Sequence, residues 1–271
     1  MPAASNRYLF QTVYSAVLRL SEEQPLAIPT TTVFSRLPLY RAVDAIHCGG
    51  LLSDKPRLTH NVARDARSPR DLDADDHRWS GKGYLPAASQ AGLYVSLSTN
   101  ALSAEMAYYQ HLSTDPLTSA PDVASTFSEI KVAPNTKRVL FVLTSLRDLL
   151  VIDFARNSAG AARFFRTLDS DPEVAKALRG TSGSTFTACR SGNDYSCSRA
   201  VALALASLKA PSYDGILVQT ARDNRAIRDD GDNLVIFGAN KTPHPKLTTS
   251  YAILPTLEKG GRMTLERIPP D

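Results

Sequence analysis

The sequence predicts an α+β fold, because helical and strand patterns both recur along its 271 residues. Apolar side chains repeat at helical spacing over residues 6–22, which predicts an amphipathic helix. Apolar and polar residues alternate over residues 92–98, as in a half-buried strand, and the apolar runs at 137–144 and 149–154 are typical of buried strands. With 43% apolar residues, the chain can fill a sizeable core.

Residues 92–111 form the best-defined unit of the chain. The strand at its start is followed by Ser-Thr-Asn at 98–100, a cluster typical of a helix N-cap, and then by residues that favour a helix. Tyr94 lies on the predicted strand and Glu105 on the predicted helix, so both can reach the mouth of a single cleft. The plain alternative is an amphipathic strand and helix with a solvated glutamate.

Shorter patterns predict the remaining elements. Pro25 and Pro29 end the first helix. Stretches rich in glycine, serine or charge predict long loops at residues 53–84 and 179–197. We further expect helices at 161–177 and 198–208, strands at 214–221 and 232–239, an edge strand at TTSYAIL, and a loose tail from Glu258.

Composition narrows the class of protein. Lys and Arg number 31 against 27 Asp and Glu, and this net charge of +4 is too small and too dispersed to require a nucleic-acid partner. The longest apolar run, residues 200–206, is far shorter than the ~18 residues of a membrane span, and the N-terminus shows no secretory signal. Cys48, Cys189 and Cys197 lack metal-ligand spacing, so we expect free thiols in a reducing compartment, the cytoplasm.

Several familiar catalytic motifs are absent from the sequence. It contains no G-x-S-x-G, no H-E-x-x-H, no G-x-x-x-x-G-K-[ST] and no G-x-G-x-x-G after a strand. Its five histidines do not pair at helical ligand spacing. We therefore expect no metal catalysis.

Polar residues stand at three further points where a ligand could be held. Arg41 follows a short apolar run, where an arginine is either a snorkelling surface group or a fork for a phosphate. Arg78 begins the segment RWSGKG, whose glycines and positive charge could bring backbone N–H groups to a phosphate. Ser196 and Ser198 stand at the start of a predicted helix, and either could simply cap it.

Taken in order, these segments resemble the RES-domain family, which is named for an arginine, a glutamate and a serine. LYR supplies Arg41, RWSGKG stands where the family usually has G-R-W-N-P-P and supplies Arg78, and GLYVSLS supplies Tyr94, with Glu105 in the helix that follows. NDYSCSRAV places Ser196 at the family's serine, while LLVIDF and DGILVQTA resemble two buried strands of the family. The resemblance runs from about residue 40 to about residue 237. The sequence departs from the family's pattern at the residue after Arg41 and in the S-G-K of RWSGKG.

The resemblance implies a toxin that destroys NAD. The implied fold is ADP-ribosyltransferase-like, with a split, twisted sheet, flanking helices and a central NAD cleft. Glu105 would stabilise the ribosyl cation that forms when the nicotinamide–ribose bond breaks. Arg41 would hold the pyrophosphate with help from Arg78, Tyr94 would stack against or orient the nicotinamide, and Ser196 would bond the ribose or a phosphate. The residues implied to bind NAD are Arg41, Arg78, Tyr94, Ser96 and Ser196.

In this interpretation NAD is the substrate, and either water or phosphate accepts the ADP-ribose. Two other functions stay open, namely transfer of ADP-ribose to a protein or small molecule, and a catalytically inactive module that binds a partner. The resemblance also implies a cognate antitoxin or immunity protein, with no direct nucleic-acid or membrane partner. We expect a helical extension at residues 1–36, a catalytic domain at 37–257 and a tail at 258–271.

Overall fold

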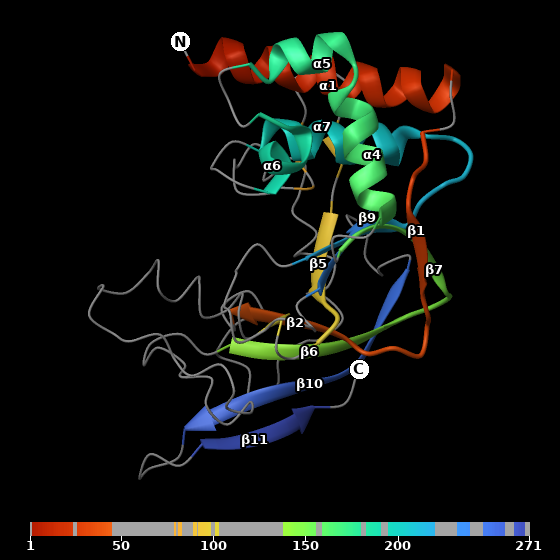
Figure 1. Ribbon diagram of the computed structural model, residues 1–271. Coiled ribbons are helices and arrows are strands. Elements are labelled where there is room, and N and C mark those ends of the chain that lie inside the picture. Colours follow the sequence, from red (N-terminus) through yellow and green to blue (C-terminus); the bar gives the residue numbers. More distant parts are fainter. Residues whose placement is uncertain are drawn as a thin grey trace.

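The computed structural model of the chain describes residues 2–23, 26–44, 79, 81–82, 89–90, 92–98, 101–102, 138–155, 159–179, 183–190, 195–219, 232–238, 246–257 and 263–268. The labelled helices are α1 (Pro2–Glu23), α4 (Ala159–Asp169), α5 (Pro172–Ala177), α6 (Thr185–Arg190) and α7 (Ser196–Ser207). The strands are β1 (Thr30–Val33), β2 (Leu39–Asp44), β3 (Gly81–Lys82), β4 (Ser89–Gln90), β5 (Gly92–Ser96), β6 (Arg138–Ser145), β7 (Leu149–Phe154), β8 (Gly215–Gln219), β9 (Asp232–Phe237), β10 (Leu247–Leu257) and β11 (Met263–Ile268). The helices gather at one end of the molecule, over the strands (Figure 1).

Nine of the described strands form one sheet, in the order β1-β7-β8-β9-β5-β2-β6-β10-β11, and β3 and β4 form a small hairpin. Strands β7 and β8 are parallel, and the other neighbours in the sheet are antiparallel. A large mixed sheet with flanking helices confirms the predicted α+β class. Within the described ranges, no helix is long and apolar enough to cross a membrane.

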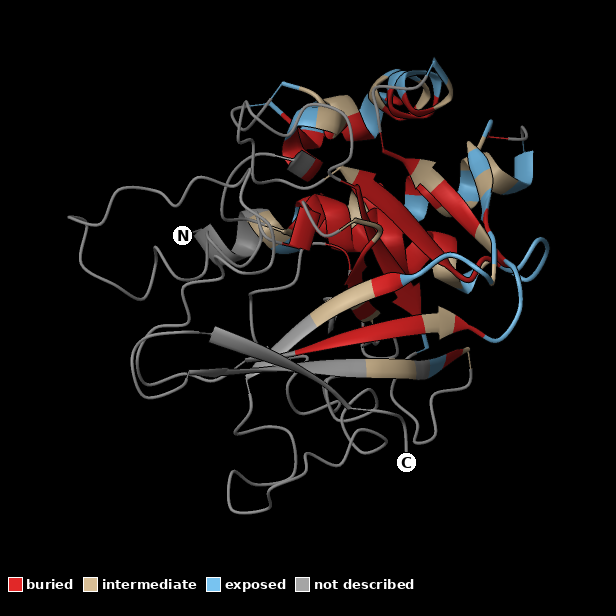
Figure 2. Cartoon of the chain, turned by 90° about the horizontal axis from the view of Figure 1, so that it is seen from below, coloured by how far each residue is buried: buried red, intermediate tan, exposed pale blue. Residues whose placement is uncertain are grey.

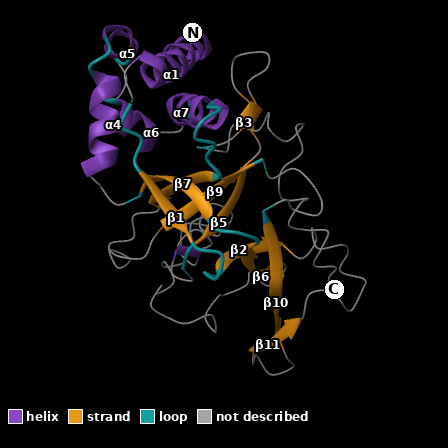
Figure 3. Ribbon diagram, turned by 90° about the vertical axis from the view of Figure 1, so that its right-hand side faces the viewer, coloured by secondary structure: helices purple, strands orange, loops and turns teal. Residues whose placement is uncertain are grey.

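The sheet is divided between β5 and β2. Strand β5 pairs with β9 over five residues and β2 pairs with β6 over six, but β5 and β2 are joined by the single pair Tyr40–Ser96. One half of the sheet is therefore β1-β7-β8-β9-β5, and the other is β2-β6-β10-β11. Figure 3 shows β2, β6, β10 and β11 to one side of β1, β7, β9 and β5. This division is the split sheet that the sequence analysis expected.

Alternation along the strands builds two hydrophobic cores. On β7, Ile152 and Phe154 belong to the core shared with the helices, whereas Leu149 and Val151 belong to a second core. The second core takes side chains from both halves of the sheet, including Leu93 of β5 and Phe141 of β6. Figure 2 shows buried strands and helical segments, in red, at the centre of the molecule. Because β7 is buried on both faces, its sequence is a nearly continuous apolar run, as predicted.

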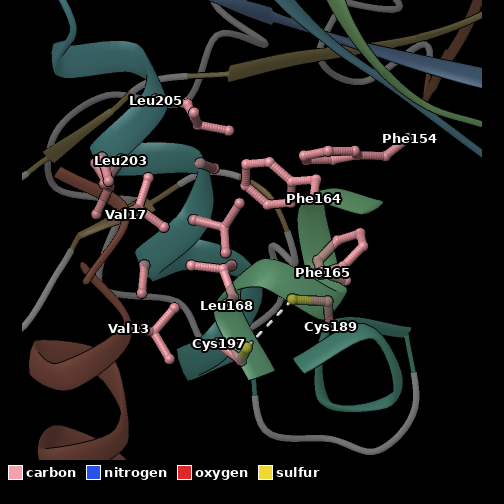
Figure 4. Close-up of a cluster of buried hydrophobic side chains, with 14 of the residues drawn as sticks. Val13, Val17, Phe154, Phe164, Phe165, Leu168, Cys189, Cys197, Leu203 and Leu205 are labelled. Atoms are coloured by element: carbon pink, nitrogen blue, oxygen red, sulfur yellow. Dashed lines mark hydrogen bonds between the residues drawn. The ribbon is translucent and has the colours of Figure 1, made fainter. Parts of the chain in front are cut away.

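The helix predicted at residues 6–22 is confirmed as α1, which begins at Pro2. Val13 and Val17 on its apolar face are fully buried in the helix-side core (Figure 4). Burial of one such side chain stabilises the folded state by about 1.5–3 kcal/mol. Helix α1 packs against α7, so the segment that we expected as an extension shares the main core.

The single helix predicted after β7 is two helices, α4 and α5. Pro172 lacks a backbone N–H and cannot continue the helix before it. Asp171 instead caps a new helix, because its side chain accepts hydrogen bonds from the N–H groups of Glu173 and Val174, both at 3.0 Å. Arg19 of α1 also bonds the Asp171 carboxylate, which holds α5 against α1.

The loop predicted at residues 179–197 contains helix α6. Ser184 begins this helix as its N-cap, because its Oγ accepts the N–H of Thr187 at 3.2 Å and its carbonyl accepts the N–H of Ala188 at 2.9 Å. The glycine, serine and threonine content of the segment favoured a loop and concealed this cap.

The prediction that Ser196 or Ser198 caps the next helix is also wrong. Helix α7 begins at Ser196, so Ser196 and Ser198 both lie inside its first turn. Tyr195 holds the N-cap position without a side-chain cap bond, and Ser198 Oγ donates to the Tyr195 carbonyl at 3.1 Å. Burial of this turn, rather than a cap, positions the start of α7.

The C-terminal segment differs from the prediction in two places. Strand β10, expected at an edge, lies between β6 and β11. Where a loose tail was expected, Met263–Ile268 forms β11 and pairs with β10 over six residues. The mixed polar sequence of β11 fits a sheet edge, where one side of the strand has no neighbouring strand.

Asp214 connects the two halves of the sheet. Its buried carboxylate accepts two hydrogen bonds from Arg147, at 2.9 and 2.6 Å, and lies 3.1 Å from Lys246 Nζ. Arg147 follows β6 and Lys246 precedes β10, whereas Asp214 precedes β8 and also accepts the N–H of Leu150 on β7. Burial by itself raises the pKa of Asp214, but these hydrogen bonds and charges outweigh it and hold the pKa below the ordinary 3.8.

We predict that Asp214→Asn lowers the free energy of unfolding by roughly 2–3 kcal/mol at neutral pH, because Arg147 and Lys246 lose their carboxylate. Since the pKa of Asp214 is lower in the folded state, its contribution to stability is present above the ordinary carboxyl pKa and is lost as pH falls through the folded value. The difference between wild type and variant should therefore shrink in acid. Urea unfolding across a pH series measures both effects.

Ser145→Ala is the matched control for this experiment. Among the described residues, Ser145 Oγ is buried without a hydrogen-bond partner, so its removal should leave the free energy of unfolding unchanged or slightly raised. Equal stability of Asp214→Asn and wild type at neutral pH would show that the carboxylate does not join the two halves.

Candidate functional site

Arg41 spans the division in the sheet. It lies on β2, and its Nη1 donates to the Tyr94 carbonyl of β5 at 2.5 Å. The N–H of Leu97 bonds Asp232 near the start of β9, and backbone groups alternate in direction along a strand, so the Tyr94 carbonyl faces β2. Arg41 is therefore half-buried and bonded at the point where the backbone ladder between β2 and β5 is lost, instead of extending into solvent as a surface group.

Tyr94 holds the segment that contains Trp79. Its hydroxyl accepts the backbone N–H of Trp79 at 2.7 Å, and its ring packs against the helix-side core. The Trp79 side chain is 4% exposed and lies 5.9 Å, centroid to centroid, from Phe154 of β7. The structure thus brings Tyr94 and Trp79 together. Arg78 itself lies outside the described residues.

Ser96 and Asn233 form a buried polar pair beside this contact. The two residues are opposite each other on β5 and β9, and Ser96 Oγ donates to Asn233 Oδ1 at 2.8 Å. They are 4% and 6% exposed. The NAD-binding residues implied by the family resemblance include Ser96 but not Asn233, although two polar residues opening the apolar run DNLVIF were a signal. A buried amide needs such a partner, so the pair orients both side chains.

The predicted cap after β5 is present. Ser98 Oγ accepts the N–H of Ala101 at 3.1 Å, and the Ser98 carbonyl accepts the N–H of Leu102 at 3.2 Å. Together these bonds place Ser98 at the N-cap of a helix that begins as the pattern predicted. Glu105 lies outside the described residues, so its position and role stay a prediction.

Ser196 lies in the helical layer, in the first turn of α7. Its side chain is 2% exposed, and Arg199 in the same helix is 6% exposed, with its guanidinium 5.7 Å from the centre of the Tyr195 ring. Helix α7 also contacts β4, the partner of β3 in the hairpin that holds Gly81 and Lys82. Trp79 therefore contacts Tyr94, and the hairpin that follows it contacts α7 through β4. Arg199 was missed, although a single charge in the apolar run SRAVALALASL was a signal.

The site residues thus divide into three groups. Arg41, Tyr94 and Ser96 meet where the sheet divides, and Ser196 lies in the helical layer on the side of the sheet to which the Tyr94 ring packs. Glu105 and Arg78 are outside the described residues. Among the described residues, no group of three or more His, Cys, Asp and Glu side chains could hold a metal ion. The arrangement offers cationic and hydrogen-bonding groups near an aromatic ring, which suits an anionic ligand with a flat ring.

No known family model matches this chain, and no curated protein matches it. Among solved structures, the chain is similar to a crystal structure of the M. tuberculosis MbcT–MbcA toxin–antitoxin complex. The two chains share 18% identity with a TM-score of 0.42, and 91% of each is covered. That likeness says nothing about the activity of this chain.

We predict that Tyr94→Phe loosens the segment around Trp79, because the Trp79 N–H loses an acceptor worth about 1 kcal/mol. Trp79 is the only tryptophan in the sequence, so its emission reports this segment directly. The emission should shift to longer wavelength and become easier to quench with acrylamide. Tyr8→Phe, at a position 44% exposed, should change neither property. An identical spectrum for Tyr94→Phe and wild type would mean that the hydroxyl does not hold this segment.

Proposed function

We propose that this protein is an NAD-degrading enzyme that cleaves the nicotinamide–ribose bond, as the resemblance to RES-domain toxins suggests. The observation that supports the proposal is the contact of Arg41 with the Tyr94 carbonyl at the division of the sheet, with Trp79 held by the same tyrosine. Three segments meet there, of which one contains Arg41 and another begins at Trp79, directly after Arg78. The guanidinium of Arg41 suits the pyrophosphate of a dinucleotide, and the ring of Tyr94, the residue it bonds, suits the nicotinamide.

The described residues would bind and orient the substrate. Arg41 would present N–H donors to the pyrophosphate oxygens in a planar fork. The carbonyl and hydroxyl of Tyr94 already bond Arg41 and Trp79, so its contribution to NAD would be the ring, placed against the nicotinamide. Ser96, fixed by Asn233, and Ser196, in the first turn of α7, would contribute hydroxyls near the ribose or phosphate.

The bond-breaking step would need a carboxylate, and Glu105 is the candidate. As the bond from the ribose carbon to the nicotinamide nitrogen breaks, its electron pair leaves with nicotinamide and positive charge builds on the ribose. A carboxylate near that carbon stabilises the charge more in the transition state than in the ground state. Water then adds to the carbon and releases a proton, giving ADP-ribose, or phosphate adds and gives the phosphorylated sugar.

Depletion of NAD would arrest growth of the bacterial cell in whose cytoplasm the enzyme acts. A protein of this activity would need a cognate antitoxin or immunity protein, and a partner carboxylate placed on Arg41 would mimic the substrate's own charge. Two alternatives remain, namely transfer of the ADP-ribose to a protein or small molecule, and an inactive module of the same fold. The products formed from NAD, with and without phosphate or an acceptor, separate all three.

We predict that the purified protein consumes NAD and releases nicotinamide, and that Glu105→Ala abolishes nearly all of this activity. The loss follows because the developing positive charge would have no carboxylate beside it. Chromatography of the nucleotides measures the rate, and thermal melting checks the fold. Glu22→Ala, on the exposed surface of α1, is the matched control and should keep the wild-type rate. Wild-type turnover by Glu105→Ala would refute this mechanism.

We also predict that Arg41→Lys weakens NAD turnover about ten- to a hundredfold, because lysine keeps the charge but loses the planar fork. The effect should appear mainly in KM if the arginine binds the pyrophosphate equally in the ground and transition states. Arg7→Lys, an exposed change on α1, should leave the kinetics unaltered. If Arg41→Lys has the kinetics of wild type, Arg41 joins the two strands and does not handle substrate.

A further inference from the structure

Two cysteines outside the proposed mechanism lie side by side in the helix-side core. Cys189 of α6 and Cys197 of α7 are 0% and 1% exposed, and their Sγ atoms are 3.2 Å apart (Figure 4). Neither is in a disulfide, as the sequence predicted. We propose that this pair is an oxidation site, at which a hydroperoxide converts the two thiols into a reversible disulfide.

The geometry favours a link over two separate oxidations. A disulfide requires an S–S distance of about 2.05 Å, so the sulfurs need to approach by only about 1.2 Å. Cys189 Sγ donates to Cys197 Sγ, and Cys197 Sγ in turn lies 3.7 Å from the Thr185 carbonyl, so the two sulfurs face each other. Any oxidised sulfur formed here has the second sulfur as its nearest reaction partner.

The short helix α6 allows both the approach and the access. It is six residues long, and Thr185 anchors its first turn to Asp169 of α4 through bonds of 2.7 and 2.8 Å to the carboxylate. Cys189 lies near the opposite end, where a small rotation of the helix moves Sγ without breaking those bonds. Local opening of a single short helix costs less than global unfolding, so it admits a small oxidant to a buried sulfur.

The reaction balances with one hydroperoxide. The sulfur of one cysteine attacks a peroxide oxygen, the O–O bond breaks, and a sulfenic acid and water form. The sulfur of the second cysteine then displaces the sulfenic oxygen, which leaves as water, and the S–S bond forms. Two thiols lose two electrons and two protons, and hydrogen peroxide becomes two waters. The disulfide would join α6 to the first turn of α7 at the residue directly after Ser196. Oxidation would therefore fix that turn in place, which is a property beyond the proposed function.

Tryptic peptide mapping tests the link. Cys48→Ser removes the third cysteine from every sample, leaving Cys189 and Cys197. Trypsin cuts after Arg190, so an oxidised sample should yield the peptides 180–190 and 191–199 joined to each other, and dithiothreitol should separate them. The linked pair should form when hydrogen peroxide is added to the folded protein, and Cys189→Ala should not yield it.

Thermal melting provides a second measurement. The oxidised protein should melt about 5 °C higher than the reduced protein, because the link restricts the unfolded chain. Cys189→Ala treated in the same way should show no shift, and Cys197→Ala replaces it if that variant does not fold. Thiols that stay unreacted in the folded protein, or sulfinic acids without a link, would overturn the proposal. Neither readout involves NAD, so failure here is distinct from failure of the proposed function.

Discussion

Strand β5 has two neighbours and pairs fully with only one of them, and this constraint shapes the rest of the molecule. Its ladder with β9 is complete, whereas its ladder with β2 stops after Tyr40–Ser96. A carbonyl turned toward the opening would lose its backbone donor, and a buried unpaired carbonyl costs about 1–3 kcal/mol. Arg41 supplies the donor from its side chain. The sheet can therefore divide without leaving the Tyr94 carbonyl unsatisfied, and a cationic side chain is held at the opening.

A second connection between the two halves of the sheet is made by charged side chains instead of backbone hydrogen bonds between strands. Asp214 receives Arg147 and Lys246 from the β6–β10 side and the Leu150 N–H from β7. Taking a carboxylate out of water is costly unless cations and N–H groups replace the lost hydration. The partners of Asp214 provide that replacement, and both halves also contribute side chains to the second core.

Most polar atoms of the candidate site are engaged with the protein itself. The Tyr94 hydroxyl holds the Trp79 backbone, and Ser96 holds Asn233. These bonds restrict side-chain rotation before any ligand arrives, which lowers the entropy lost on binding. In the proposed function such residues orient the substrate, Arg41 holds the pyrophosphate, and Glu105 stabilises the positive charge at the reacting bond. The paired arrangement also explains why Asn233 escaped sequence analysis, since its role depends on the residue opposite it across the sheet.

Local sequence determined the elements whose signals lie within a few residues of one another. The apolar face of α1, the alternation of β5, the apolar runs of β7 to β9 and the cap at Ser98 are of this kind, because helix and strand periods and cap bonds involve neighbours in the chain. The resemblance to a family implied that Arg41, Arg78 and Tyr94 share a site, and the described residues bring Arg41, Trp79 and Tyr94 together.

Tertiary structure alone decided the strand order, the interior place of β10, the strand at β11, the helix at α6 and the bonding partners of Arg41 and Ser96. Ser96 and Asn233 are 137 residues apart in the chain, and no periodic pattern extends over such a distance. Their contact arises only when the packing of two cores selects one register for β5 against β9, which is a property of the whole folded chain.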